Sequence, residues 1–155
     1  MGKIIAVVSG KGGTGKTSFT ACVGLALAEM GYETLALDCD ITLRNLDLAL
    51  GLSDSAAMDF SDVLEGRCTL AEAAVRHRKY QKLSLLAAPL APVNARFDQA
   101  AMSALAREIR ETYDYCLIDA PAGLGQGFAL ATGMADSAVV VTTTDPAALR
   151  DAQRT

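Results

Sequence analysis

The sequence predicts an α/β fold in which helices cover both faces of a doubly wound, mostly parallel sheet. Short apolar segments alternate with helical ones along the 155 residues. Strands that are apolar without alternation are typical of a parallel sheet covered on both faces. The first such strand leads through a glycine-rich loop into a helix, which is the start of a βαβ unit. At this length a single domain, residues 1–155, is expected.

The strands are assigned from continuous apolar runs that are bounded by turn residues. The first covers residues 3–9, and it leads directly into the glycine-rich loop. The others are expected at 34–38, 83–87 (before a loop with Pro89 and Pro92), 115–119 and 137–142.

The helices are assigned from apolar side chains at helical spacing and from cap signals. Residues 17–30 show this spacing and end before Gly31, and residues 99–111 show it again. Shorter helical segments are expected at 59–65, after Thr69 (which forms a capping box with Glu72) and after Asp145, where Pro146 takes the first helical position. The apolar residues at helical spacing are Phe19, Val23, Ala26, Leu27 and Met30 in the first helix, and Met102, Leu105 and Ile109 in the other.

Residues 10–17, Gly-Lys-Gly-Gly-Thr-Gly-Lys-Thr, match the phosphate-binding pattern G-x-x-x-x-G-K-[ST] at every fixed position. Glycines let backbone N–H groups turn toward an anion without hindrance from Cβ atoms. Lys16 adds a positive charge for the terminal phosphates, and the Thr17 hydroxyl suits Mg²⁺. The helix that follows favours phosphate at its N-terminus. The predicted nucleotide-binding residues are Gly10, Lys11, Gly12, Gly13, Thr14, Gly15, Lys16 and Thr17.

Acidic residues end two of the predicted strands. Asp38 and Asp40 are two residues apart, so they project to one side in extended geometry. Asp119 ends a later strand, and a turn with Gly123 follows. Ligands of doubly wound sheets bind at the carboxyl ends of the strands, where buried carboxylates need a cationic partner. Water held on Mg²⁺, or an attacking water, would serve Asp38 and Asp40. Thr17, Asp38 and Asp119 are the candidate magnesium ligands, and the Gly123 N–H is expected to sense the γ-phosphate.

The composition favours a globular enzyme of a reducing compartment. Fourteen basic and 18 acidic residues give a net charge of −4, which argues against a general nucleic-acid-binding surface. The basic run 76–79 is interpreted as a solvated helix end, and its His77 has no nucleophile beside it. The four cysteines form no C-x-x-C pair, so reduced and mostly buried thiols are expected. No apolar run approaches the roughly 18 residues of a membrane span.

A second lysine, Lys11, follows the first glycine of the loop, where the phosphate-binding pattern requires none. One interpretation is a solvated surface charge. However, the stretch from Lys11 to Thr17 resembles the deviant Walker A loop of the MinD/ParA family of ATPases. In that family the early lysine reaches the phosphates of a partner across a nucleotide-sandwich dimer. The resemblance thus implies that Lys11 is a catalytic residue supplied in trans, like an arginine finger.

The resemblance runs through all 155 residues. Residues 38–48 resemble switch I of the MinD family and its interface helix, and residues 119–123 resemble switch II. This implies that Asp40 orients the attacking water and that Ser18 reaches the α-phosphate. Lys16, with Lys11 and Asp40, completes the implied catalytic set.

Some residues depart from the pattern or have a second interpretation. Thr42 stands where the family usually has glycine, and Leu124 and Gln153 stand where it has acidic residues. The stretch from Arg44 to Leu48 is also interpretable as a short surface helix capped by Asn45. Both interpretations of this stretch can hold together.

The function implied by the resemblance is that of a slow, partner-stimulated ATPase. It would use ATP and Mg²⁺, form an ATP-dependent homodimer and act in bacterial division-site placement with MinC- and MinE-like regulators, without nucleic acid. The implied location is the cytoplasm and the inner face of the cell membrane. A non-catalytic nucleotide-dependent interaction module is the competing hypothesis. A flagellar-number regulator or a ParA-type partitioning relative is a further alternative.

We also expect the chain to be the N-terminal part of a longer domain. The run from Ala138 to Val141 is apolar without alternation, which suits a strand with neighbours on both sides. No further strand follows it, and the helix after Asp145 has no glycine stop before Thr155. By resemblance, adenine recognition and membrane attachment would belong to later segments. An exposed last strand predicts poor solubility or self-association.

Overall fold

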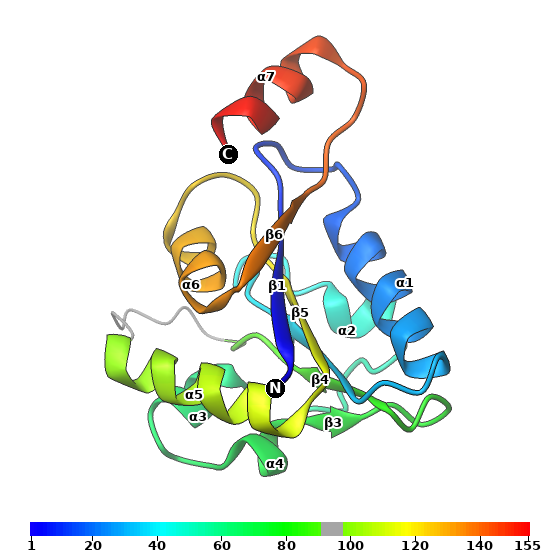
Figure 1. The fold of residues 1–155 in the computed structure, drawn as a ribbon, viewed down its shortest axis with the longest axis vertical. Coiled ribbons are helices and arrows are strands. Elements are labelled where there is room, and N and C mark those ends of the chain that lie inside the picture. Colours follow the sequence, from blue (N-terminus) through cyan, green and yellow to red (C-terminus); the bar gives the residue numbers. More distant parts are fainter. Residues whose placement is uncertain (91–97) are drawn as a thin grey trace.

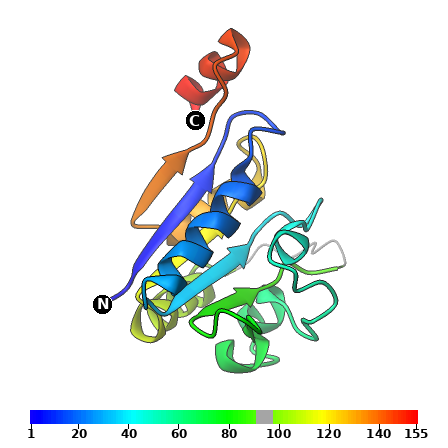
Figure 2. The ribbon, with the colours of Figure 1, turned by 90° about the vertical axis from the view of Figure 1, so that its right-hand side faces the viewer.

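The computed structural model describes residues 1–90 and 98–155, so Pro92 of the expected loop lies outside the described residues. In the described part, six strands form one sheet in the order β3-β4-β2-β5-β1-β6 (Figures 1 and 2). Five strands are parallel, and the short β3 runs antiparallel to β4. The strands are β1 (Lys3–Val8), β2 (Thr34–Asp38), β3 (Val75–Arg76), β4 (Leu83–Leu86), β5 (Tyr115–Asp119) and β6 (Ser137–Val140).

Helices cover both faces of this sheet, which confirms the predicted fold class. One core packs α1 and α2 against β2 and β4. The other core packs α3 to α6 against β1, β2 and β5. The helix α7 lies beyond the carboxyl ends of the strands, next to the loop that follows β1 (Figure 1). The helices are α1 (Lys16–Glu29), α2 (Leu46–Ala49), α3 (Phe60–Leu64), α4 (Leu70–Ala73), α5 (Gln99–Thr112), α6 (Gln126–Met134) and α7 (Pro146–Arg154).

The first helix forms where predicted, but its buried face does not consist of the large apolar residues. Phe19 and Met30 are exposed. The reason lies in the close approach of α1 to the sheet: a Cβ atom on Gly24 would lie only 3.4 Å from Cδ1 of Leu83. Small residues therefore make the contact, namely Thr20, Ala21, Gly24 and Ala28.

The basic run around His77 is not a helix end, contrary to the prediction. Arg76 belongs to β3, and His77 organises the turn between β3 and β4. Its Nδ1 accepts hydrogen bonds from the backbone N–H groups of Lys79 and Tyr80 at 3.1 and 3.0 Å. This double acceptance assigns the proton to Nε2, which donates to the Leu50 carbonyl at 3.1 Å. The histidine is therefore a structural residue of the turn.

The expectation of mostly buried thiols is only half right. Cys39 and Cys116 are buried, and burial raises the pKa of both thiols. Cys68 is half-buried, whereas Cys22 is exposed because it lies on the side of α1 that faces away from the sheet. All four cysteines are free.

The last strand, β6, forms an edge of the described sheet, where it pairs with β1. Ser137, Ala138 and Val140 are exposed on it. An edge strand presents unpaired N–H and C=O groups to which other chains can add.

We expect the 155-residue chain to self-associate at high concentration whether or not ATP is present, because the apolar edge of β6 is open. The substitution Val140→Lys should reduce this association, since charged side chains oppose edge pairing. Leu149→Lys is the matched control: Leu149 is 46% exposed and Val140 44%, but Leu149 lies on α7. Sedimentation velocity measures the effect. A parent chain that stays monomeric and unfolds cooperatively, or equal effects of the two substitutions, would contradict the expectation.

Candidate nucleotide-binding site

The glycine-rich loop connects β1 to α1 at the carboxyl edge of the sheet (Figure 1). Gly13 and Gly15 have φ angles of 73° and 94°, which only glycine adopts readily. Gly15 is the N-cap of α1, and no side-chain hydrogen bond caps this helix. The backbone N–H groups of the first turn are therefore free to bind an anion.

Lys16 is the first residue of α1 and is only 8% exposed. Its Nζ donates a hydrogen bond to the hydroxyl of Ser9 at 2.8 Å. The predicted phosphate-binding charge thus lies in a poorly solvated place, where it acts on an anion with little screening.

Thr17 and Asp119 are in direct contact. The Thr17 hydroxyl donates to Oδ2 of Asp119 at 2.6 Å. The Oδ1 atom of Asp119 is buried and has no hydrogen-bond partner in the described part of the chain. Burial raises the pKa of this carboxyl, while the hydrogen bond from Thr17 and the charge of Lys16 oppose the rise. A buried carboxylate with one unpaired oxygen is suited to bind a cation.

The pair of Thr17 and Asp119 fits Mg²⁺. Hydroxyl and carboxylate oxygens are the hard ligands that this ion prefers, and it usually takes only one or two carboxylates besides phosphate oxygens and water. The described residues contain no group of three or more His, Cys, Asp or Glu side chains that would hold a metal. The arrangement is therefore that of an ion shared with a phosphate ligand, not of an ion enclosed by protein.

The structure does not bring Asp38 into this pair, although its backbone is the cross-strand neighbour of Asp119. Its Oδ1 accepts from the backbone N–H of Asp40 at 2.9 Å, and its Oδ2 from that of Leu46 at 3.3 Å. Asp38 thus binds the N-terminus of α2. Asn45 occupies the N-cap position of α2 as predicted, but its side chain makes no cap hydrogen bond.

Burial raises the pKa of Asp38 to about 7, and the charge of Asp119 adds to the effect. The carboxyl therefore binds a proton in the folded chain but not in the unfolded chain between about pH 4 and pH 7. By linkage, the free energy of unfolding falls as the pH rises through this window, by up to about 4 kcal/mol.

We expect Asp38→Asn to make this decrease in stability between pH 4 and pH 7 clearly smaller, as measured by urea unfolding at several pH values. Asp136→Asn is the control. A hydrogen bond from Arg110 lowers the pKa of Asp136, so the stability that Asp136 contributes is lost only below about pH 4. The slope between pH 4 and pH 7 should therefore stay as in the parent. Equal slopes in the parent and Asp38→Asn would contradict the prediction.

A cavity of about 340 Å³ lies between the glycine loop and the segment after β2. Asp40 stands at its wall, and its Oδ1 accepts from the backbone N–H groups of Thr42 and Leu43 at 3.1 and 3.0 Å. Sequence reasoning did not single out Leu43, Asn45 or Ala122 as site residues, because nothing in these residue types signals a ligand. The lining residues are Gly12, Gly13, Gly15, Lys16, Thr17, Ser18, Asp40, Leu43, Asn45 and Ala122.

Six of the predicted site residues do not line the cavity, namely Gly10, Lys11, Thr14, Asp38, Asp119 and Gly123. The N–H of Gly123 donates to the carbonyl of Ser9 at 3.2 Å. Lys11 is exposed, and its Nζ lies 3.7 Å from Oδ2 of Asp145. Lys11 thus pairs with the N-cap residue of α7 and does not line the cavity of its own chain.

The loop contacts α7 at Gly10. A Cβ atom on Gly10 would lie 2.5 Å from the backbone oxygen of Asp151, which leaves no room for a side chain. The helix α7 therefore rests directly on the start of the loop.

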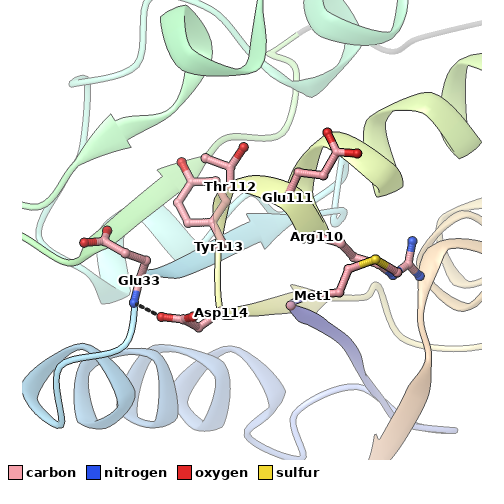
Figure 3. Close-up of a pocket in the computed structure, with 8 residues that line it drawn as sticks. Met1, Glu33, Arg110, Glu111, Thr112, Tyr113 and Asp114 are labelled. Atoms are coloured by element: carbon pink, nitrogen blue, oxygen red, sulfur yellow. Dashed lines mark hydrogen bonds between the residues drawn. The ribbon is translucent and has the colours of Figure 1, made fainter.

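Another cavity, of about 380 Å³, lies at the amino ends of the strands (Figure 3). Glu33, Arg110 and Asp114 line it, and the Asp114 carboxylate accepts from the Glu33 N–H at 2.9 Å. None of the predicted site residues reaches this cavity, so it is not the candidate site.

The anion-binding loop, the buried lysine and the hydroxyl–carboxylate pair together define a P-loop nucleotide-binding domain. Comparison with known families agrees with this class: a family model described as an AAA domain matches residues 2–154. The chain belongs to this AAA domain family.

The chain is also similar to septum site-determining MinD proteins, which confirms the resemblance inferred from the motifs. The Bacillus subtilis MinD is 40% identical over 159 residues, which cover 99% of this chain and 58% of the relative. In the MinC:MinD cell division protein complex of Aquifex aeolicus, the matching chain is 40% identical with a TM-score of 0.88, over 98% of this chain and 61% of that chain. Pyrococcus horikoshii MinD, complexed with Mg-ADP, is 35% identical with a TM-score of 0.83. The match covers 97% of this chain and 62% of the Pyrococcus horikoshii chain.

The chain therefore spans less than two thirds of the length of these relatives. None of the helices in residues 1–90 and 98–155 has the length and hydropathy needed to cross a bilayer.

Proposed function

We propose that this chain is a Mg-ATP-dependent ATPase switch of the MinD type that acts in bacterial division-site placement. The observation that carries the proposal is the Thr17–Asp119 contact beside the buried Lys16, at one wall of a cavity. Cation ligands and a phosphate-binding charge are thereby adjacent, as phosphoryl transfer requires. The similarity to a MinD protein complexed with Mg-ADP supports the nucleotide and the ion.

The glycine loop and Lys16 bind the phosphates, and Ser18 reaches the α-phosphate. Thr17 and Asp119 hold Mg²⁺, which when bound neutralises phosphate charge. Asp38 supports the site by accepting hydrogen bonds from the backbone N–H groups of Asp40 and Leu46, which positions the segment that carries Asp40. The positions of Lys16, Thr17 and Ser18 at the cavity and the contact of Thr17 with Asp119 support these assignments.

Asp40 orients the attacking water. Its Oδ1 is fixed by two backbone N–H groups, so the carboxylate is held at the cavity wall in one orientation. It accepts a hydrogen bond from the water while the water oxygen bonds to the γ-phosphorus and the bond to ADP breaks. Gly123 completes the switch when its N–H leaves the Ser9 carbonyl for the γ-phosphate.

The active form is an ATP-dependent homodimer in which Lys11 contacts the partner's phosphates. Its exposed position outside the cavity of its own chain supports this role. Leu43 and Leu124 are also largely exposed, and they offer apolar contact area for a partner. MinC- and MinE-like regulators are the further partners, of which the Aquifex aeolicus complex supports the first. The location is the cytoplasm and the inner face of the cell membrane.

Steady-state ATP hydrolysis by the parent chain and by Lys16→Ala tests the proposal. Slow hydrolysis that requires Mg²⁺ and disappears in the variant would support an ATPase. Nucleotide binding without any turnover, also in the presence of MinE-like regulators, would instead support a non-catalytic interaction module. The altered residues Thr42 and Leu124 are the observation that favours this second candidate.

A further inference from the structure

Ser9 lies behind the phosphate loop, directly after β1, and is completely buried. Its hydroxyl oxygen accepts from Nζ of Lys16 at 2.8 Å and donates to the carbonyl oxygen of Lys11 at 2.6 Å. Its own carbonyl accepts from the N–H of Gly123 at 3.2 Å. Ser9 thus contacts both lysines of the loop, Lys11 and Lys16, and also Gly123 in the segment that resembles switch II.

The Ser9 hydroxyl cannot act on a bound nucleotide directly, because Ser9 does not line the cavity. A hydroxyl has one donor, which the Lys11 carbonyl takes, and this orients its lone pairs toward Lys16. The Lys16 ammonium has three N–H donors, and Ser9 uses one of them. Two donors remain for phosphate oxygens.

We propose that Ser9, whose hydroxyl is oriented by its hydrogen bond to the Lys11 carbonyl, is a positioning residue that aims the Lys16 ammonium at the nucleotide. The proposal rests on the proposed function, since it concerns the same nucleotide site. A lysine side chain has a flexible four-carbon stem, and binding must restrict it. The buried hydroxyl restricts it in advance, so less conformational freedom is lost when phosphate arrives.

We expect Ser9→Ala to bind ATP and ADP about tenfold more weakly in the presence of Mg²⁺, as measured by isothermal titration calorimetry. Ser84→Ala is the matched control, because Ser84 is also a buried serine but lies on β4, away from the loop. Its nucleotide affinity should equal that of the parent. Urea unfolding establishes that both variants fold; if Ser9→Ala does not, Ser9→Cys takes its place, since sulfur accepts hydrogen bonds only weakly.

A double-mutant cycle separates positioning from a general structural effect. If Ser9 acts through the ammonium, adding Ser9→Ala to Lys16→Gln should change ADP affinity less than about twofold, measured at millimolar ADP by thermal denaturation. An equal tenfold loss in both backgrounds would overturn the proposal, and so would parental affinity in Ser9→Ala alone. Parental affinity in Lys16→Gln would instead overturn the proposed function.

Discussion

The ATP affinity of Lys16→Ala is expected to fall at least about a hundredfold, beyond the reach of calorimetry. The Lys16 ammonium keeps two donors for phosphate oxygens, and charge-assisted hydrogen bonds contribute about 1.5 to 3 kcal/mol each. Two such bonds correspond to roughly 10² to 10⁴ in affinity. The low exposure of the side chain adds to the effect, because water screens its charge poorly.

Lys82→Ala is the control for the loss of a positive charge. Lys82 precedes β4 at the amino end of the sheet, where it donates to the Gly31 carbonyl. Its removal should leave ATP affinity unchanged. Unchanged affinity in Lys16→Ala, with a normal urea unfolding curve, would contradict the assignment of the loop as a phosphate site.

Lys11→Ala is expected to bind nucleotide as the parent does but to lose ATP-dependent dimerisation and partner-stimulated hydrolysis. The side chain pairs with Asp145 and does not line the cavity of its own chain, so binding to the monomer does not need it. A cation supplied in trans to a phosphoryl-transfer site contributes about 10³ to 10⁵ in rate. Light scattering with Mg-ATP measures dimerisation, in the Val140→Lys background so that association through β6 does not interfere.

Asp145→Asn is the control for this experiment. It removes the charge that lies 3.7 Å from Nζ of Lys11 but keeps an N-cap residue for α7. Such an exposed ion pair contributes no more than about 1 kcal/mol. If Lys11 served only this pair, Lys11→Ala and Asp145→Asn would behave alike. Equal dimerisation of Lys11→Ala and the parent would likewise return Lys11 to an ordinary surface charge.

The sequence was sufficient to predict the elements whose local signals agree with their packing. β2 and β5 begin and end at the predicted residues, and α5 buries Met102, Leu105 and Ile109 as its periodicity indicates. The capping box of Thr69 and Glu72 also forms. In these strands and helices, the residues that favour the strand or helix conformation are also the residues that face the core.

Prediction failed where the contacts of an element contradict its composition. The helix α6 was not predicted, because Gly127 and Gly133 lower helix propensity; yet Gly127 is required, since a Cβ there would lie 2.4 Å from the Pro121 ring. The sequence also pointed to Asn45 as the cap of α2, whereas Asp38, eight residues before Leu46, accepts its N–H. Such a partner is visible only once the chain has folded.

In the candidate site, too, some features could be predicted from the sequence and others could not. The loop and the strand-end carboxylates have recognisable spacing, so their positions were predicted from the sequence. The direction of each carboxylate was not: Asp119 meets Thr17, whereas Asp38 turns to the backbone of Asp40 and Leu46. Ser9 carries no motif, because a serine before the loop becomes informative only through its buried contacts.

The tight contact at Gly10 bears on how this chain can diverge in evolution. The need for glycine at the start of a phosphate loop is ordinarily explained by the space that the bound phosphate requires. Here the backbone of α7 occupies the place of a side chain, 2.5 Å from where a Cβ would stand. A descendant that had given up nucleotides altogether would still be under selection to keep this glycine, as long as it kept α7. Retention of Gly10 alone in a diverged homologue is therefore evidence of inherited architecture, not of retained chemistry.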